Sequence, residues 1–74
     1  MATAKQIKLA LRADVAQRME DARDPILGLI TFHASVAYGA IWSASRAEAI
    51  SDKERYEYLA EIRQIIEAAN QVLA

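Results

Sequence analysis

Few residues in this chain have the chemistry to act as catalysts. His33 is the only histidine and there is no cysteine, which excludes His–Cys dyads and multi-histidine metal sites within one chain. A lone histidine in an apolar stretch is typical of a hydrogen-bonded packing residue. A glycine-rich phosphate loop is also absent, because Gly28 and Gly39 are the only glycines and lie far apart in the sequence.

Three carboxylates, Glu54, Glu57 and Glu61, fall on or beside one face of an expected helix. Acid–base catalysis needs a desolvated pocket that separates the pKa values of two such groups, and we interpret these three as part of a solvated helix surface. The sequence therefore predicts a protein that is not an enzyme, with no catalytic residue, no bound metal and no cofactor.

The aromatic residues suggest binding instead. Tryptophan and tyrosine supply much of the binding energy where proteins meet, which makes Phe32, Tyr38, Trp42 and Tyr58 candidate partner-binding residues. The alternative for Trp42 is a core contact, in which it packs on Tyr56 or Tyr58 within one chain.

Two helix starts are marked in the sequence. Asp24-Pro25 combines an N-cap side chain with a proline at the first helical position. Ser51 and Glu54 have the spacing of a capping box. We therefore predict helices over about 3–23, 25–48 and 52–73, within a single helical domain of residues 1–74.

The segment from Pro25 to Ser45 carries no charged residue and is apolar or small nearly all round, as expected of a helix with several neighbours. Its large residues form one row, namely Leu27, Ile30, Ala34, Ala37 and Ile41. Its small residues form another, namely Ser35, Gly39, Ser43 and Ala47. Small residues allow helix backbones to approach closely, and mid-helix glycine is unfavourable unless something compensates. We expect the small row to be an oligomer interface; the alternative is that Gly28 or Gly39 accommodates a bulky side chain of the same chain.

The final segment predicts an amphipathic helix with one buried face. Apolar residues recur at alternating steps of three and four, at Leu59, Ile62, Ile66, Ala69 and Leu73. This helix and the middle one are expected to form a long antiparallel hairpin.

The N-terminal segment has two interpretations. As a helix, Thr3 and Gln6 would form a capping box. As a strand, residues 6–11 alternate with period two. In the second case Lys5 to Ala22 resemble the opening of ribbon-helix-helix repressors, although Arg12 stands where that family usually has proline. The resemblance implies a DNA-binding repressor or antitoxin that uses residues 5–12, with Gln6, Lys8 and Arg12 as DNA contacts.

Size and charge complete the prediction. A chain of 74 residues with a net charge of −1 has a small core and no overall field that would attract nucleic acid or anionic lipid. We predict an all-α protein: a helical hairpin with an additional N-terminal helix, completed as a bundle by forming a homodimer or tetramer.

Function is predicted by elimination. We expect a non-enzymatic cytoplasmic protein that binds another protein as a regulator, an inhibitor or an antirepressor-like accessory factor. Nucleic acid is a partner only in the ribbon-helix-helix alternative. A small membrane protein is the third reading and no membrane partner is expected, because polar residues interrupt the uncharged segment and its flanks are mixed in sign.

Overall fold

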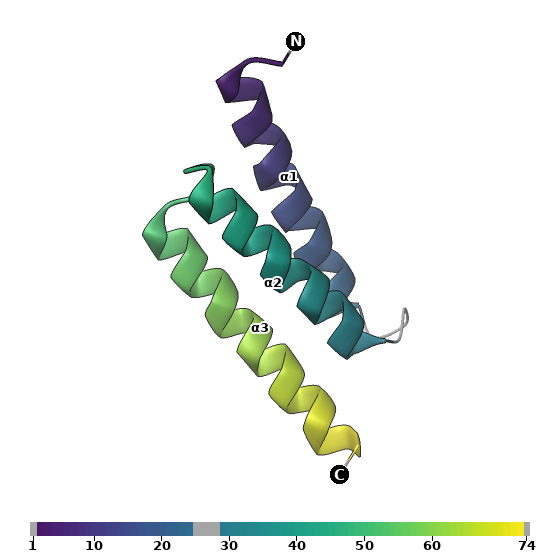
Figure 1. The fold of residues 1–74 in the computed structure, drawn as a ribbon. Helices are drawn as coiled ribbons and strands as arrows, with labels where there is room; N and C mark the ends of the chain where they lie inside the picture. Colours follow the sequence, from purple (N-terminus) through teal and green to yellow (C-terminus); the bar gives the residue numbers. More distant parts are fainter. Residues whose placement is uncertain (1, 25–28, 74) are drawn as a thin grey trace.

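The structure, a computed structural model, describes residues 2–24 and 29–73, which form three α-helices and no strand (Figure 1). The helices are α1 (Ala4–Arg23), α2 (Ile30–Arg46) and α3 (Asp52–Leu73). This confirms the predicted all-α class. α2 packs against both other helices, whereas α1 and α3 touch each other much less. In Figure 1, α1 and α3 run in the same direction and α2 runs against them.

α1 begins with the capping box expected from the sequence. The Gln6 amide donates to Thr3 Oγ1 (3.1 Å) and the Thr3 amide donates to Gln6 Oε1 (2.8 Å). Residues 5–11 lie inside this helix, so the strand alternative is wrong, and the described residues contain no ribbon of the kind that ribbon-helix-helix repressors use. The physical reason is that alanine, leucine and lysine favour helix, and the box satisfies free amides at its first turn.

The chain leaves helical geometry at Asp24, as predicted, with φ −84° and ψ 109°. The helix start expected at Pro25 and the tight crossing suggested at Gly28 lie outside the described residues. α2 begins at Ile30, because Leu29 adopts the left-handed conformation with φ 48° and ψ 42°. The prediction of one helix over residues 25–48 is therefore wrong at its N-terminal end: the helix does not run through Leu29.

α2 ends in a Schellman motif that contains no glycine. The Ala49 amide donates to the Ala44 carbonyl (2.8 Å) and the Glu48 amide to the Ser45 carbonyl (3.0 Å), which is the double hydrogen bond of this motif. Glu48 occupies the left-handed position with φ 57°. This conformation turns the chain back within a few residues and places α3 beside α2.

α3 starts at the predicted capping box. The Glu54 amide donates to Ser51 Oγ (3.0 Å), and the Ser51 amide donates to Glu54 Oε1 (2.9 Å). Two otherwise unpaired amides are thereby satisfied, and the helix occupies the residues expected for it.

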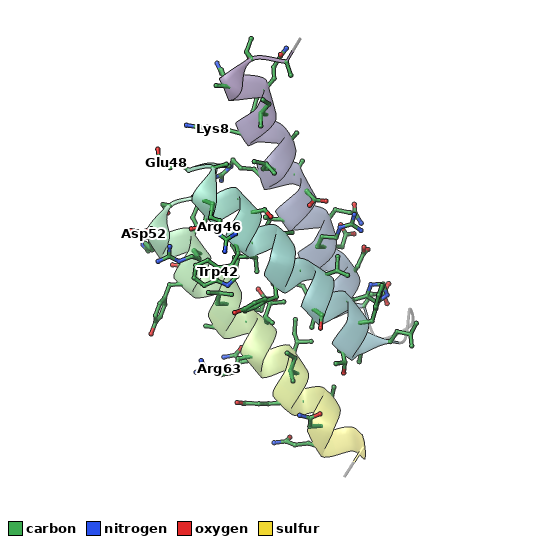
Figure 2. The ribbon with its side chains drawn as sticks, in the orientation of Figure 1. Lys8, Trp42, Arg46, Glu48, Asp52 and Arg63 are labelled. Carbon is green, nitrogen blue, oxygen red and sulfur yellow. The ribbon has the colours of Figure 1, made fainter. Side chains whose placement is uncertain are left out.

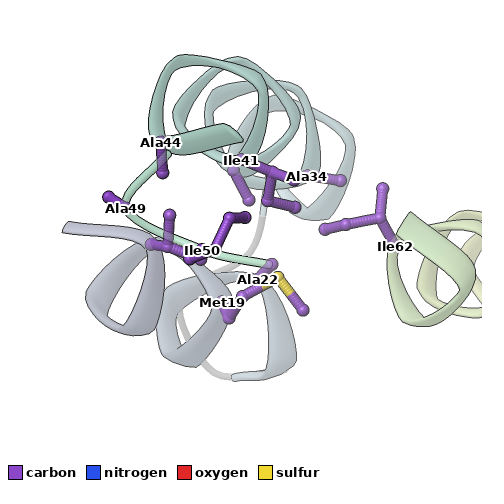
Figure 3. Close-up of a cluster of buried hydrophobic side chains, with 10 residues drawn as sticks. Met19, Ala22, Ala34, Ile41, Ala44, Ala49, Ile50 and Ile62 are labelled. Atoms are coloured by element: carbon purple, nitrogen blue, oxygen red, sulfur yellow. The ribbon is translucent and has the colours of Figure 1, made fainter. Parts of the chain in front are cut away.

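The core lies mainly between α1 and α2 (Figure 3). Its largest fully buried side chains are Met19, Ile41 and Val15. Several other core positions are alanines, which allow the two helices to approach closely; they are Ala22, Ala34, Ala37 and Ala44. Ile50, from the α2–α3 connection, and Ile62, from α3, complete the cluster. Over the residues with a described position, no helix combines the length and the apolarity needed to cross a membrane.

Candidate interaction surface

One face of α2 is buried against the other helices, and the opposite face is exposed to solvent. Ala34, Ala37 and Ile41 are buried against the other helices. The opposite face carries no charge until Arg46 and remains exposed, although it belongs to the most apolar helix of the protein. This open face of α2 is the surface that the fold leaves without an intramolecular partner among the described residues.

The predicted small row lies on that open face. Ser35, Gly39 and Ser43 are exposed, and Ala47 is half-buried at the end of the helix. A Cβ built on Gly39 would meet no atom within 4 Å. Among the described residues that are not its chain neighbours, no side chain therefore occupies the space beside Gly39, and the alternative that Gly39 accommodates Trp42 is wrong. Its role as an interface with a second copy stays a prediction.

Two aromatic residues are prominent on or beside this face. Phe32 is 60% exposed and Tyr38 is 52% exposed. Phe32 packs edge-on against half-buried His33, with ring centroids 5.4 Å apart. The described residues contain no group of three or more potential metal ligands.

Trp42 is held within the chain, by neighbours that differ from the predicted ones. The Arg55 guanidinium lies 5.2 Å from the centroid of its ring, and Tyr38 meets it edge-on at 6.3 Å. No ring contact with Tyr56 or Tyr58 occurs in the part of the chain that is described, and Tyr56 is 77% exposed. Figure 2 shows Trp42 between α2 and α3, near Arg46. Trp42 therefore joins the two helices and is not a free anchor.

Two arginines of α1 reach across to α3. Arg12 forms a two-pronged ion pair with Glu54, at 3.1 Å and 2.8 Å, and its Nη1 also donates to the Ala49 carbonyl (2.9 Å). Arg23 pairs in the same way with Glu61, with Nη2 to Oε1 at 2.9 Å. The hydrogen bonds from Arg12 lower the pKa of Glu54 to about 2. Those from Arg23 lower the pKa of Glu61.

A cavity of about 200 Å³ lies beside these pairs and is lined by Glu54, Glu57, Tyr58 and Glu61. The prediction of a solvated acidic surface missed the fact that Glu54 and Glu61 face α1. A signal was present: Arg12 and Arg23 are three helical turns apart, and Glu54 and Glu61 two turns apart, so each pair shares a helix face. Because arginine holds both carboxylates ionised, neither can serve as a proton donor near neutral pH.

The residues named for DNA contact are engaged within the chain or dispersed along α1. Gln6 closes the first capping box, Arg12 pairs with Glu54 and Lys8 is half-buried. Figure 2 shows Lys8 in the part of α1 that extends beyond the end of α2. Gln6 and Arg12 are thus occupied by contacts within the chain.

Comparison with known proteins does not indicate a function for this chain. No protein-family model matches the chain, and neither a curated protein nor a solved structure matches it.

Proposed function

We propose that this protein acts by binding and not by catalysis, and that it associates with a second copy of itself through the open face of α2. The observation that carries the proposal is the exposure of an uncharged helix face around Gly39. This face consists of small uncharged side chains with the exposed Phe32 ring among them, so another surface can cover it without burying a charge. In its assembled form the protein binds another protein and regulates or inhibits it, as an antirepressor-like accessory factor would.

Three features support self-association across this face. The small row lets two backbones approach closely, Gly39 has open space around its Cα, and a neutral surface meets its own copy without like-charge repulsion. Phe32 lies on the same face, where a large exposed ring gains most from being covered.

The test is the molar mass of the purified protein, measured by light scattering and sedimentation at micromolar concentration. Wild type should be an oligomer and Gly39→Leu should dissociate it, because the leucine keeps the backbones apart. Ala13→Leu adds a similar bulk to an exposed position of α1 and should leave the molar mass unchanged. A wild-type monomer with a cooperative melt, or an oligomer that Gly39→Leu does not affect, contradicts the α2 interface.

A further inference from the structure

A groove of about 510 Å³ runs along α3 on the side of Tyr38. Its floor is apolar and consists of Leu59, Ile62 and Ile66 from α3, with the Tyr38 ring from α2 beside them. The ion pairs to α1 involve Glu54 and Glu61, which lie on a different side of α3 from Leu59 and Ile66. The groove is thus an apolar surface separate from the small row of α2.

Two charged residues border this groove on α3, Arg63 and Glu67. They stand four residues apart, a spacing that allows pairing along a helix. Neither takes part in an ion pair or a side-chain hydrogen bond within the described residues, unlike Arg12, Arg23 and Arg55. Figure 2 shows Arg63 at the surface of α3. One positive and one negative group therefore remain available beside an apolar floor.

This pattern of charge is complementary to itself. When two copies of α3 pack antiparallel about a two-fold axis, each residue on one side of the axis meets the residue at the mirrored position of the other copy. An axis that passes midway between residues 63 and 67 brings Arg63 beside Glu67 of the second copy, and Glu67 beside its Arg63. Ile66 then lies close to the axis, where it meets the apolar floor of the second groove.

We propose that the α2–α3 groove is a homodimer interface in which two α3 helices pair antiparallel, with two reciprocal Arg63–Glu67 ion pairs. A partner of uniform charge would satisfy only one of the two groups, whereas a second copy satisfies both. This surface does not depend on the α2 crossing proposed above. If both interfaces form and their two-fold axes meet at right angles, the assembly closes as a tetramer, a dimer of dimers.

The experiment uses charge reversal, with Gly39→Leu as a background that leaves only the groove interface. In that background, Arg63→Glu and Glu67→Arg should each weaken the dimer about tenfold, because the altered group faces a like charge twice across the axis. The double variant Arg63→Glu/Glu67→Arg should restore the wild-type dissociation constant. An equimolar mixture of the two single variants should form a heterodimer, which native mass spectrometry detects when one variant carries a mass label.

Circular dichroism of each variant checks that the exposed substitutions leave the helices intact. Dissociation constants that do not change with either reversal, or a mixture that fails to pair preferentially, would falsify the groove interface. A Gly39→Leu protein that is monomeric at all micromolar concentrations also contradicts it, while leaving the α2 crossing supported. Conversely, a tetramer that Gly39→Leu does not affect contradicts the α2 crossing alone.

Discussion

Glu54 is bound by Arg12 and by the start of its own helix at the same time. Its Oε1 accepts from the Ser51 amide (2.9 Å) and from Arg12 Nη1 (3.1 Å), while Oε2 accepts from Arg12 Nη2 (2.8 Å). Arg12 also donates to the Ala49 carbonyl in the α2–α3 connection. One carboxylate and one guanidinium therefore tie α1 to the first turn of α3, although these two helices contact each other much less than either contacts α2.

The acid dependence of stability should follow from this pair and from Arg23–Glu61. Arg12 lowers the pKa of Glu54 from 4.5 to about 2, and Arg23 lowers the pKa of Glu61. A carboxylate whose pKa is lowered by folding stabilises the protein above its unfolded pKa, and this contribution is lost as the pH falls through the folded value. The contribution of these two pairs to stability should thus be fully present above about pH 5 and fall progressively from about pH 4.5 towards pH 2.

Thermal melts across that range measure the effect, with Arg12→Ala as the comparison. The variant should have a lower Tm at neutral pH and a shallower fall in acid, because its Glu54 has lost the group that lowers the pKa. Arg12→Lys keeps the charge but cannot contact both Glu54 oxygens and the Ala49 carbonyl together, so its Tm should lie between the two. High salt should reduce the difference, since the pair is partly exposed. Parallel acid profiles for wild type and Arg12→Ala would contradict this account.

At Glu48, the backbone conformation decides whether a glycine substitution raises or lowers stability. Its φ of 57° lies in the left-handed region, where a side chain is unfavourable and glycine is preferred at the end of a helix. Glu48→Gly should therefore increase the free energy of unfolding by about 0.5–1 kcal/mol. The same change at exposed Glu57, inside α3, should decrease it by about 1 kcal/mol. Urea unfolding of both variants checks this; a loss of stability in both would show that Glu48 is not held in that conformation.

The core makes a third prediction. Met19 is fully buried between α1 and α2, so Met19→Ala should lower the free energy of unfolding by about 2–5 kcal/mol. Ile7 lies on the same helix but is 49% exposed, and Ile7→Ala should cost less than about 1 kcal/mol. Denaturant melts compare the two. Equal decreases in the free energy of unfolding for the two variants would mean that Ile7 is buried in solution.

Some parts of this fold were predictable because they depend on local hydrogen bonds. The Ser51–Glu54 capping box fixes the start of α3, and both of its bonds are formed. The Thr3–Gln6 box favours a helical α1 in the same way. The alternating residues that follow are also compatible with a strand, and only the structure of the whole chain decides between helix and strand. The spacing of the apolar residues could not distinguish helix from strand here, because a short alternating run fits both structures.

Other parts depend on contacts that local sequence does not encode. The left-handed Leu29 starts α2 five residues later than Pro25 suggests, and neither Leu29 nor Glu48 is a residue type that favours this conformation. The partner of Trp42 is Arg55 and not a tyrosine of α3, since the register of α3 against α2 follows from the turn at Glu48. The ion pairs of Arg12 and Arg23 with α3 likewise depend on where α3 lies relative to α1.

Trp42 offers a direct probe of that register. It is the only tryptophan, its Nε1 is buried without a hydrogen-bond acceptor among the described residues, and Arg55 covers its ring while also donating to Ser45 Oγ (3.0 Å). Arg55→Ala should expose the indole, shift its fluorescence emission to the red and lower stability by about 0.5–1 kcal/mol. Lys53→Ala, at an exposed position two residues earlier, should leave the spectrum unchanged. A red shift in both variants would point to a general loosening of the first turn of α3.

Gly39→Ala separates what the helix gains from what the interface loses. Within one chain the new methyl group meets nothing within 4 Å, and alanine is favoured over glycine inside a helix by about 0.5–1 kcal/mol. The isolated chain should therefore become more stable. If two α2 helices cross at Gly39, the same methyl group separates their backbones and the oligomer should dissociate more readily. Melts at low and high protein concentration should then cross, with the variant more stable when dilute and wild type more stable when concentrated. A variant that is more stable at every concentration would place the crossing elsewhere, because helix propensity would be its only effect.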